Sequence, residues 1–249
     1  MRLRHGERKG HKQMSMLSIE NLNCSYGNVQ VLWDVCLNVG EGEIVALLGA
    51  NSAGKTTLLN AVTGVLPPTS GSISFMGEKI SALSPSQIVE KGISYLPEGG
   101  RLFPDMTIRE NLEMGAYTRK NWKRRNIMMD RVFEMFPKLK EREKQLARTM
   151  SGGEQQMLAM ARGLMSEPKL CMFDELSYGL APIMVQEVFR IVQTLRDQGI
   201  TVLLVEQNVH QSLEIAARAY VLENGRIALE GPSASLLEDD YVKKAYLGM

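Results

Sequence analysis

Residues 46–64, ALLGANSAGKTTLLNAVTG, constrain the fold more than any other part of this sequence. The mostly apolar run before the loop, residues 43–48, is short and bounded by glycines, which predicts a buried strand. Apolar residues recur at helical spacing after Lys55, so we expect a helix to begin near Gly54. A strand, a Gly-x-x-x-x-Gly-Lys-Thr loop and a helix form the P-loop pattern, which predicts a phosphate-binding turn.

The residue types of this loop suit a bound polyphosphate. Glycines let backbone N–H groups turn inward as a nest for anions, and the helix N-terminus adds partial positive charge. Lys55 can reach the terminal phosphates, and the Thr56 hydroxyl is a ligand for Mg²⁺. A chance loop is the alternative, but the flanking strand and helix argue against it. We therefore expect ATP and Mg²⁺ as cofactors. The candidate nucleotide-binding residues here are Gly49, Asn51, Ser52, Ala53, Gly54, Lys55, Thr56 and Thr57.

Two adjacent carboxylates follow another apolar run, KLCMFDEL, at residues 169–176. A P-loop protein needs an acid at the end of a neighbouring strand to hold Mg²⁺, directly or through water, and Asp174 fits that role. Glu175 is placed to orient or deprotonate an attacking water. An Asp-Glu pair alone would suggest a solvated strand end, but its position after a P-loop favours the catalytic interpretation.

A second helix start has the features of a phosphate site. In MSGGEQQMLAMARGLM, residues 150–165, Ser151 can cap a helix, and Glu154 stands at capping-box spacing. Gly152 and Gly153 leave the first N–H groups of this helix uncovered. An ordinary capped helix is the alternative interpretation. One ATP has no evident need for two separate helix N-termini from the same chain. Two such sites are explained if a second subunit supplies one of them.

Composition excludes several classes of protein. The 249 residues carry a net charge of +1, which argues against general nucleic-acid binding as the main task. No apolar stretch approaches the ~20 residues that span a bilayer, and the N-terminus does not resemble a secretory signal. The three cysteines are widely spaced and predict neither a disulfide framework nor a metal site.

The pattern of apolar runs predicts an α/β fold. Helical segments alternate with the later runs, which is typical of a parallel sheet, and the N-terminal runs are separated by turns. Residues 109–147 have apolar positions at helical spacing, and their Met-rich face is either core or an adaptable partner-binding surface. Strands are expected at residues 17–22, 29–33, 35–39, 43–48, 72–76, 93–96, 170–173, 202–205 and 219–222.

In full, we expect a P-loop ATPase core with a mixed, mainly parallel sheet, an antiparallel β subdomain at the N-terminal side and an inserted helical subdomain. We expect a disordered basic tail at residues 1–15, a single domain at residues 16–249, and the helical insertion at about residues 99–160. The alternative for the tail is an arm that binds a membrane surface or nucleic acid.

These motifs together resemble the ABC ATPases, the nucleotide-binding subunits of ATP-binding-cassette transporters. Residues 151–156, SGGEQQ, are similar to the signature of that family, and the resemblance covers about residues 17–249. It implies a head-to-tail dimer in which two ATP molecules lie between the P-loop of one chain and the signature of the other. Tyr26 matches the aromatic residue that stacks on adenine, although an ordinary turn tyrosine is the alternative. Residues 177–181 match the segment that crosses the dimer interface.

The sequence departs from the usual family pattern at four positions. Glu98 stands where a glutamine normally touches Mg²⁺ and water, and it adds negative charge beside the phosphates. Gln207 stands where a histidine normally contacts the γ-phosphate, and glutamine cannot become cationic. Leu176 replaces a proline, and Ser52 replaces a loop glycine. We keep Glu98 and Gln207 as candidate catalytic residues with Glu175, and Thr56, Asp174 and Glu98 as candidate metal ligands.

The departures resemble one subgroup, the second ATPase subunit of branched-chain amino-acid importers. That resemblance implies integral membrane permease subunits and a sister ATPase as partners, and a peripheral location on the cytoplasmic face of the cell membrane. A heterodimer with asymmetric sites is expected, with a homodimer as the alternative. The P-loop site of this chain would bind MgATP well and hydrolyse it slowly.

Three other functions remain open at this point. One is the ATPase subunit of a lipid or polysaccharide exporter. Another is a non-catalytic module that uses ATP as a dimerisation switch, which Glu98 and Gln207 leave open for the isolated chain. A third is a soluble ABC ATPase of repair or translation. Such proteins carry long coiled coils or two cassettes, and neither feature is present in this sequence.

Overall fold

Two sheets form the framework of this computed structural model, which describes residues 15–247. A four-stranded antiparallel sheet has the order β2-β1-β4-β5, and a six-stranded sheet has the order β10-β9-β3-β8-β7-β6. In the larger sheet β3, β6, β7, β8 and β9 run parallel, and β10 pairs antiparallel with β9. The strands are β1 (Ser15–Tyr26), β2 (Val29–Gly40), β3 (Ile44–Leu48), β4 (Ser70–Phe75), β5 (Glu78–Lys79), β6 (Ile93–Leu96), β7 (Leu170–Asp174), β8 (Thr201–Glu206), β9 (Arg218–Glu223) and β10 (Arg226–Pro232).

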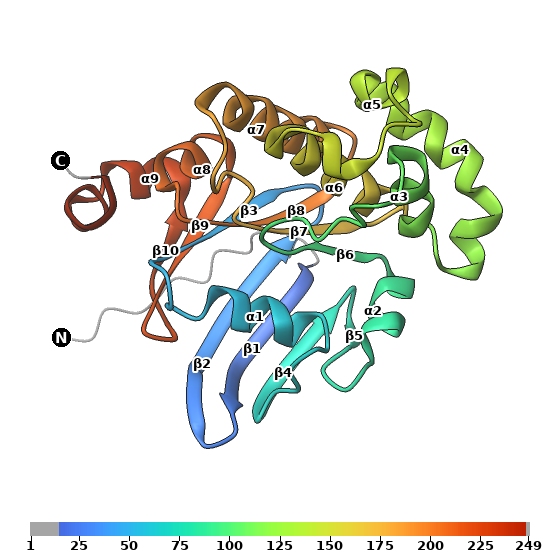
Figure 1. Cartoon of the computed structure of the whole chain (residues 1–249). Helices are drawn as coiled ribbons and strands as arrows, with labels where there is room; N and C mark the ends of the chain where they lie inside the picture. Colours follow the sequence, from blue (N-terminus) through green and yellow to red (C-terminus); the bar gives the residue numbers. More distant parts are fainter. Residues whose placement is uncertain (1–14, 248–249) are drawn as a thin grey trace, which may run out of the picture.

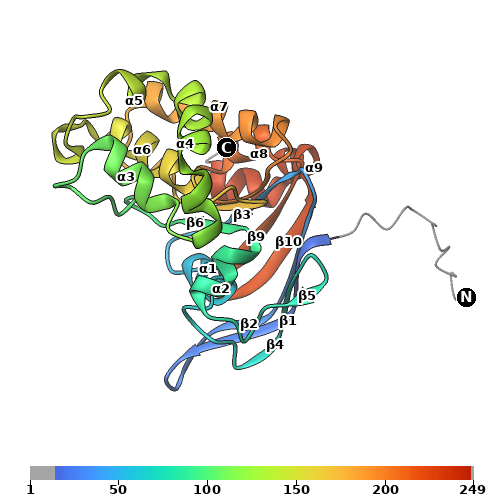
Figure 2. The same ribbon diagram turned by 90° about the vertical axis from the view of Figure 1, so that its right-hand side faces the viewer.

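Helices cover both faces of the six-stranded sheet. Helices α6, α7 and α8 lie on one face, and α1 lies on the other, between the two sheets (Figure 1). The helices α3, α4 and α5 project to one side (Figure 2). The helices are α1 (Lys55–Val62), α2 (Pro85–Lys91), α3 (Ile108–Gly115), α4 (Arg119–Met135), α5 (Pro137–Glu141), α6 (Gly152–Leu164), α7 (Pro182–Asp197), α8 (Val209–Ile215), α9 (Ser233–Glu238) and α10 (Asp240–Val242). Within residues 15–247, no helix has both the length and the apolar character needed to cross a bilayer.

Strand β3 explains how the sheet divides the core. All five of its residues are buried, because it is covered on both faces. Val45 and Leu47 point into the core shared with β1, β2 and α1. Ile44, Ala46 and Leu48 point into the core shared with α6, α7 and α8. The strand therefore leads straight from two hydrophobic cores into the P-loop, which gives the loop a rigid base.

The predicted fold class is confirmed, with several local corrections. Residues 29–33 and 35–39 form one continuous strand, β2. Asp34, between them, adopts a left-handed φ of 48° without ending the strand. Asn21, with φ 47°, does the same in β1, which is longer than predicted. Ser15 begins β1 and is not part of a tail. The rest of the predicted basic tail, residues 1–14, lies outside the described residues. Strand β10 was missed, because its alternating half-exposed residues lack a continuous apolar run.

Candidate functional site

The P-loop connects β3 to α1, and its backbone leaves no room for side chains at two points. A Cβ on Gly49 would lie 2.4 Å from the carbonyl oxygen of Leu222, so that position requires glycine. Gly54 has a φ of 109°, and a Cβ there would lie 2.8 Å from Leu32. Ser52 adopts a φ of 68° although it is not glycine. The loop therefore keeps the left-handed turn that a glycine would make at position 52.

Lys55 folds back across this loop. Its ammonium group donates to the carbonyl oxygens of Gly49, at 2.7 Å, and Ala50, at 3.2 Å. The same group lies 3.1 Å from Oε1 of Glu175, and the Lys55 side chain is only 4% exposed. The lysine charge is thus held between two carbonyls and a carboxylate, where a terminal phosphate could replace the carboxylate as its partner.

Asp174, at the end of β7, has the properties of a cation ligand. Its Oδ2 accepts hydrogen bonds from the Thr56 hydroxyl, at 3.0 Å, and the Tyr95 hydroxyl, at 3.2 Å. Its Oδ1 is buried and has no hydrogen-bond partner among the described residues. Burial raises the pKa of Asp174, and the nearby Glu175 carboxylate raises it further, against the hydrogen bonds from Thr56 and Tyr95. A buried carboxylate oxygen without a donor fits a divalent cation.

Glu175 is held in an unusual backbone conformation beside Lys55. Its φ is 51°, in the left-handed region, and its N–H donates to the carbonyl oxygen of Val205 at 2.8 Å. The strand-end hydrogen bond to β8 and the ion pair with Lys55 aim the carboxylate across the P-loop. Such a strained position at a candidate active site supports a specific role for the side chain.

Lys55, Thr56 and Glu175 line one cleft of about 460 Å³. Asp174 is not among its lining residues, but it accepts the hydrogen bond from Thr56. The cleft brings P-loop residues together with Glu98 and Glu175, which are two of the three candidate catalytic residues. Tyr178, from the segment after the two carboxylates, also reaches it. The lining residues are Val31, Asn51, Ser52, Gly54, Lys55, Thr56, Thr57, Glu98, Glu175 and Tyr178.

Gln207 and Tyr26 do not line this cleft. Gln207 is exposed, immediately after β8, and the buried residue at that strand end is Glu206. The Tyr26 side chain is 49% exposed and lies along α1, where its hydroxyl accepts a long hydrogen bond of 3.4 Å from the Asn60 amide. The geometry places Tyr26 beside the P-loop helix, where an exposed ring is free to stack on a ligand.

The second predicted phosphate site is the start of α6. Ser151 caps this helix: the N–H of Glu154 donates to its hydroxyl at 3.4 Å, and Oε2 of Glu154 accepts from the N–H of Ser151 at 2.9 Å. Hydrogen bonds from Ser151 lower the pKa of Glu154. A Cβ on Gly152 would meet no atom within 4 Å, whereas one on Gly153 would lie 2.8 Å from Met184. The bare helix start is therefore open at Gly152 and does not line the P-loop cleft of its own chain.

Three supporting residues were not found from the sequence. Tyr95 donates to Asp174, as described above. Glu206 accepts hydrogen bonds from the N–H and the hydroxyl of Ser177, at 3.0 and 2.7 Å. Arg162, on α6, donates to the carbonyl oxygens of Gly100 and Arg101, at 2.7 and 2.9 Å, and so holds the loop after Glu98. Each acts through a contact between elements that are distant in the sequence, which no local motif reveals.

Comparison with known proteins agrees with this geometry. Residues 32–177 match the family model described as ABC transporter. The Pseudomonas aeruginosa protein named high-affinity branched-chain amino acid transport ATP-binding protein BraG is 52% identical over 94% of this chain and 100% of its own length. The lipopolysaccharide export system ATP-binding protein LptB of Escherichia coli is 34% identical over 94% of this chain and 98% of its own length.

Solved structures have the same fold. The ADP conformation of an ATP-binding cassette of an ABC transporter has a TM-score of 0.83 and 28% identity, and the match covers 95% of this chain and 100% of that one. A nucleotide-free cassette from an ABC transporter gives the same TM-score with 26% identity, over 95% of this chain and 100% of its own. The fold, the P-loop with its two carboxylates and these matches show that the chain belongs to the ABC transporter family, as an ATP-binding cassette subunit with ATPase activity.

Proposed function

We propose that this chain is one of two ATPase subunits that power a membrane importer of branched-chain amino acids, from the cytoplasmic face of the membrane. The observation that carries the proposal is the cleft that joins Lys55, Thr56 and Glu175 at the end of a parallel sheet, in a chain 52% identical to BraG over nearly its whole length. An exporter subunit is the second candidate, and it is supported by the weaker similarity to LptB.

The residues of the candidate site have distinct proposed roles. Lys55 and the P-loop N–H groups bind the phosphates, and Tyr26 stacks on the adenine. Thr56 and Asp174 would hold Mg²⁺, which would neutralise charge on the phosphates. The unpartnered Oδ1 of Asp174 supports this fit. When phosphate becomes the partner of Lys55, the Glu175 carboxylate is released from its ion pair and accepts the proton of the attacking water.

The partner in the proposed dimer is a sister ATPase. The open start of α6, with Ser151, Gly152 and Gly153, would contact the nucleotide bound to that sister, since it does not line the cleft of its own chain. The groove beside the loop after Glu98 and the inserted helices would receive the permease. Glu98 would make the P-loop site of this chain the slower of the two sites, because it adds a negative charge to the cleft. Gln207 lies outside this cleft in the single chain, and its proposed effect is that it offers no cation to a nucleotide held between the two subunits.

Phosphate release from MgATP tests the enzymatic part of the proposal. We expect slow turnover by the purified chain at all concentrations, no turnover by Glu175→Gln, and a several-fold increase in Glu98→Gln/Gln207→His mixed with its sister. Turnover by the chain alone that rises cooperatively with concentration would instead indicate a competent homodimer. An unchanged rate in the double variant of the mixed dimer would contradict the half-site assignment.

Uptake of labelled leucine by cells tests the transport part. Cells that lack this chain should lose high-affinity uptake, and the wild-type chain should restore it. Lys55→Ala, which removes the phosphate contact, should fail to do so. Normal leucine uptake in the deletion strain, with a defect in envelope lipid export, would favour the exporter.

A further inference from the structure

A basic groove of about 730 Å³ lies between the end of α2, the start of α4 and the turn before β7. Its charged lining is unbalanced, because it holds six cationic side chains and two carboxylates. The cations are Lys91, Arg119, Lys120, Lys123, Arg124 and Lys169, and the carboxylates are Glu90 and Glu167. The net charge of the whole chain is only +1, so negative charge elsewhere on the protein offsets the excess of positive charge at this groove.

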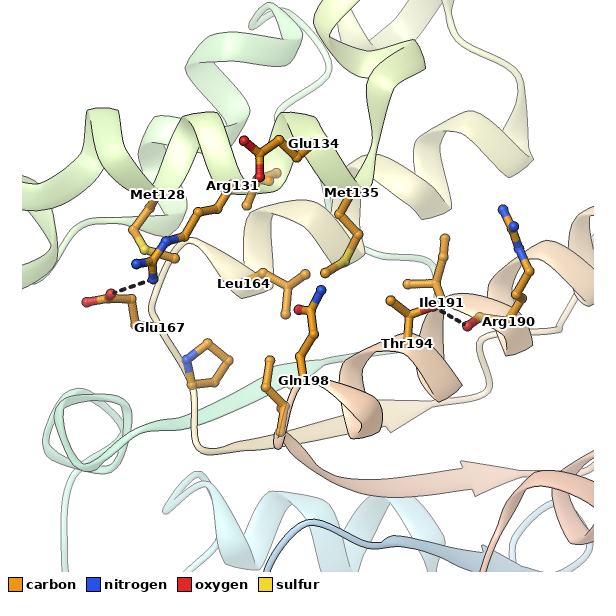
Figure 3. A pocket seen from close by; sticks show the side chains of 13 residues that line it. Met128, Arg131, Glu134, Met135, Leu164, Glu167, Arg190, Ile191, Thr194 and Gln198 are labelled. Atoms are coloured by element: carbon orange, nitrogen blue, oxygen red, sulfur yellow. Dashed lines mark hydrogen bonds and ion pairs between the residues drawn. The ribbon is translucent and has the colours of Figure 1, made fainter.

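Two of the six cations already have an ion-pair partner. Lys91 pairs with Glu78, and Arg124 pairs with Glu167 at 2.6 Å. The other carboxylate oxygen of Glu167 lies 3.8 Å from Arg131 on the opposite side. Figure 3 shows Arg131 reaching toward Glu167 in the adjoining pocket between α4 and α7. Three other cations, Arg119, Lys120 and Lys123, have no ion-pair partner among residues 15–247 and are exposed. Their charges are therefore available to an external anion.

Two large aromatic side chains border these cations. Tyr117 is 54% exposed and Trp122 is 46% exposed, although both are large enough to bury substantial area. The guanidinium of Arg125 lies 4.3 Å from the centre of the Trp122 ring. Exposed Trp and Tyr beside Lys and Arg are typical of segments at the interface between a bilayer and water. Neither a structural core nor an ion-pair network explains this combination.

The basic groove continues into the groove that would receive the permease. That second groove, of about 420 Å³, includes Tyr117, Arg101 and Phe103. Val89 and Ser166 line both grooves, so they share an edge. A surface next to the permease contact would lie close to the headgroups of the surrounding lipid.

We propose that the start of α4, with the groove that it forms against α2, binds the anionic phospholipid headgroups of the bilayer beside the permease. The proposal rests on the proposed function only in placing the chain at a membrane. Anionic lipid fits better than nucleic acid or an acidic protein segment. The cations attract its headgroups, and the exposed Trp and Tyr rings can insert into the headgroup layer. A Lys or Arg close to an anionic surface strengthens binding by about five-fold.

Co-sedimentation of the full chain with vesicles tests this binding. The vesicles are phosphatidylcholine alone, or with about one third phosphatidylglycerol to give a negative surface potential. The test variant is Arg119→Gln/Lys120→Gln/Lys123→Gln. The matched control is Lys138→Gln/Lys140→Gln/Lys144→Gln, which removes the same charge from exposed residues at the far end of the inserted helices. Residues 1–14 are identical in all three chains, so they cannot cause a difference between them.

We expect the wild type and the control to bind anionic vesicles and the test variant to bind them about a hundredfold more weakly at low salt. In a Trp33→Phe background, the fluorescence of Trp122 should shift to the blue on addition of anionic vesicles only. The rate of MgATP hydrolysis in solution should be the same in the test and control variants, so loss of lipid binding is distinguishable from loss of the ATPase function.

Three outcomes would overturn the proposal. They are equal binding to neutral and anionic vesicles, an equal loss of binding in the test and control variants, and an unchanged Trp122 spectrum. Binding to polyglutamate or to an oligonucleotide without binding to vesicles would also overturn it, and would assign the basic groove to an acidic partner.

Discussion

Glu206 offers a direct test of how the site is built, because it supports the site although no sequence motif contains it. It is 1% exposed at the end of β8, and its two carboxylate oxygens hold the N–H and the hydroxyl of Ser177. Ser177 begins the segment that resembles the interface-crossing part of the family. We compare Glu206→Ala, which removes both acceptors, with Glu206→Gln, which keeps the shape and one acceptor and replaces the other with an amide N–H that can donate to the Ser177 hydroxyl.

The expected magnitudes follow from these contacts. Hydrogen bonds to a charged group contribute about 1.5–3 kcal/mol each, and Glu206→Ala loses two of them while it relieves the burial of a charge. We therefore expect Glu206→Ala to lower the free energy of unfolding by about 2–4 kcal/mol. Glu206→Gln should change it by less than about 1 kcal/mol, because the weaker hydrogen bonds are offset by the removal of a buried charge.

The pH dependence of the free energy of unfolding provides a second, independent test. Burial raises the pKa of Glu206 above its usual value, and the Glu175 carboxylate adds to the shift against the hydrogen bonds from Ser177. The folded chain thus binds this proton more tightly than the unfolded chain, so protonation favours folding. Wild-type stability should rise relative to Glu206→Gln as the pH falls from 7 toward 5. The raised pKa of Asp174 acts in the same direction in both chains and cancels in the comparison.

Urea unfolding of the three chains at pH 7 and pH 5 measures both effects. Phosphate release from MgATP at pH 7 should fall in Glu206→Ala and be retained in Glu206→Gln, since only the alanine variant releases Ser177. Wild-type stability in Glu206→Ala, or a Glu206→Gln stability profile parallel to that of the wild type from pH 7 to pH 5, would refute the reasoning.

Three further predictions, two of them with a matched control variant, concern other parts of the site. Gly152→Ala should leave the free energy of unfolding within about 0.5 kcal/mol of the wild type, since its Cβ meets no atom within 4 Å, and yet lower steady-state turnover of the assembled dimer at least tenfold. Gly153→Ala is the matched control for unfolding and should cost about 1 kcal/mol. Ser52→Gly should raise stability by about 0.5–1 kcal/mol in thermal unfolding, because it relieves a left-handed φ of 68° at a small entropic cost. A decrease would mean that the serine hydroxyl stabilises the loop. Tyr26→Ala should weaken ATP binding about tenfold by calorimetry, whereas Tyr26→Phe should not, because the hydrogen bond to Asn60 is long at 3.4 Å. Equal affinities in the two variants would exclude stacking.

Local sequence information was sufficient where one motif contains both ends of an interaction. The P-loop, the capped start of α6 and the strand that ends at Asp174, just before Glu175, could all be predicted, since each pairs a backbone pattern with its own functional groups. Gln207 illustrates the limit. Its alignment with a family position was clear, but its side chain is exposed outside the cleft, and the adjacent Glu206 is the buried residue.

Contacts between distant segments decided the rest. Tyr95 reaches Asp174 because β6 pairs with β7, and no pattern near residue 95 indicates that pairing. Strand β10 forms because it pairs with the edge strand β9, although its own residues alternate without a hydrophobic run. Pairing between distant segments therefore positions the supporting residues, whereas the residues proposed to bind and hydrolyse ATP lie in local sequence motifs.

Arg162 shows how the two halves of the site are connected within one chain. It lies on α6, the helix whose start holds Ser151, about three turns away along the helix axis. Its guanidinium donates hydrogen bonds to the backbone carbonyl oxygens of Gly100 and Arg101, not to the side chain of Glu98. Glu98→Gln therefore changes the charge in the P-loop cleft without disturbing this connection, whereas Arg162→Ala breaks the connection without changing a group in the cleft. If Glu98 slows hydrolysis through its charge, Glu98→Gln should raise turnover of the dimer, and Arg162→Ala should lower it while ATP binding is retained. An equal effect of both substitutions on turnover would mean that the loop position, rather than the charge, controls the site.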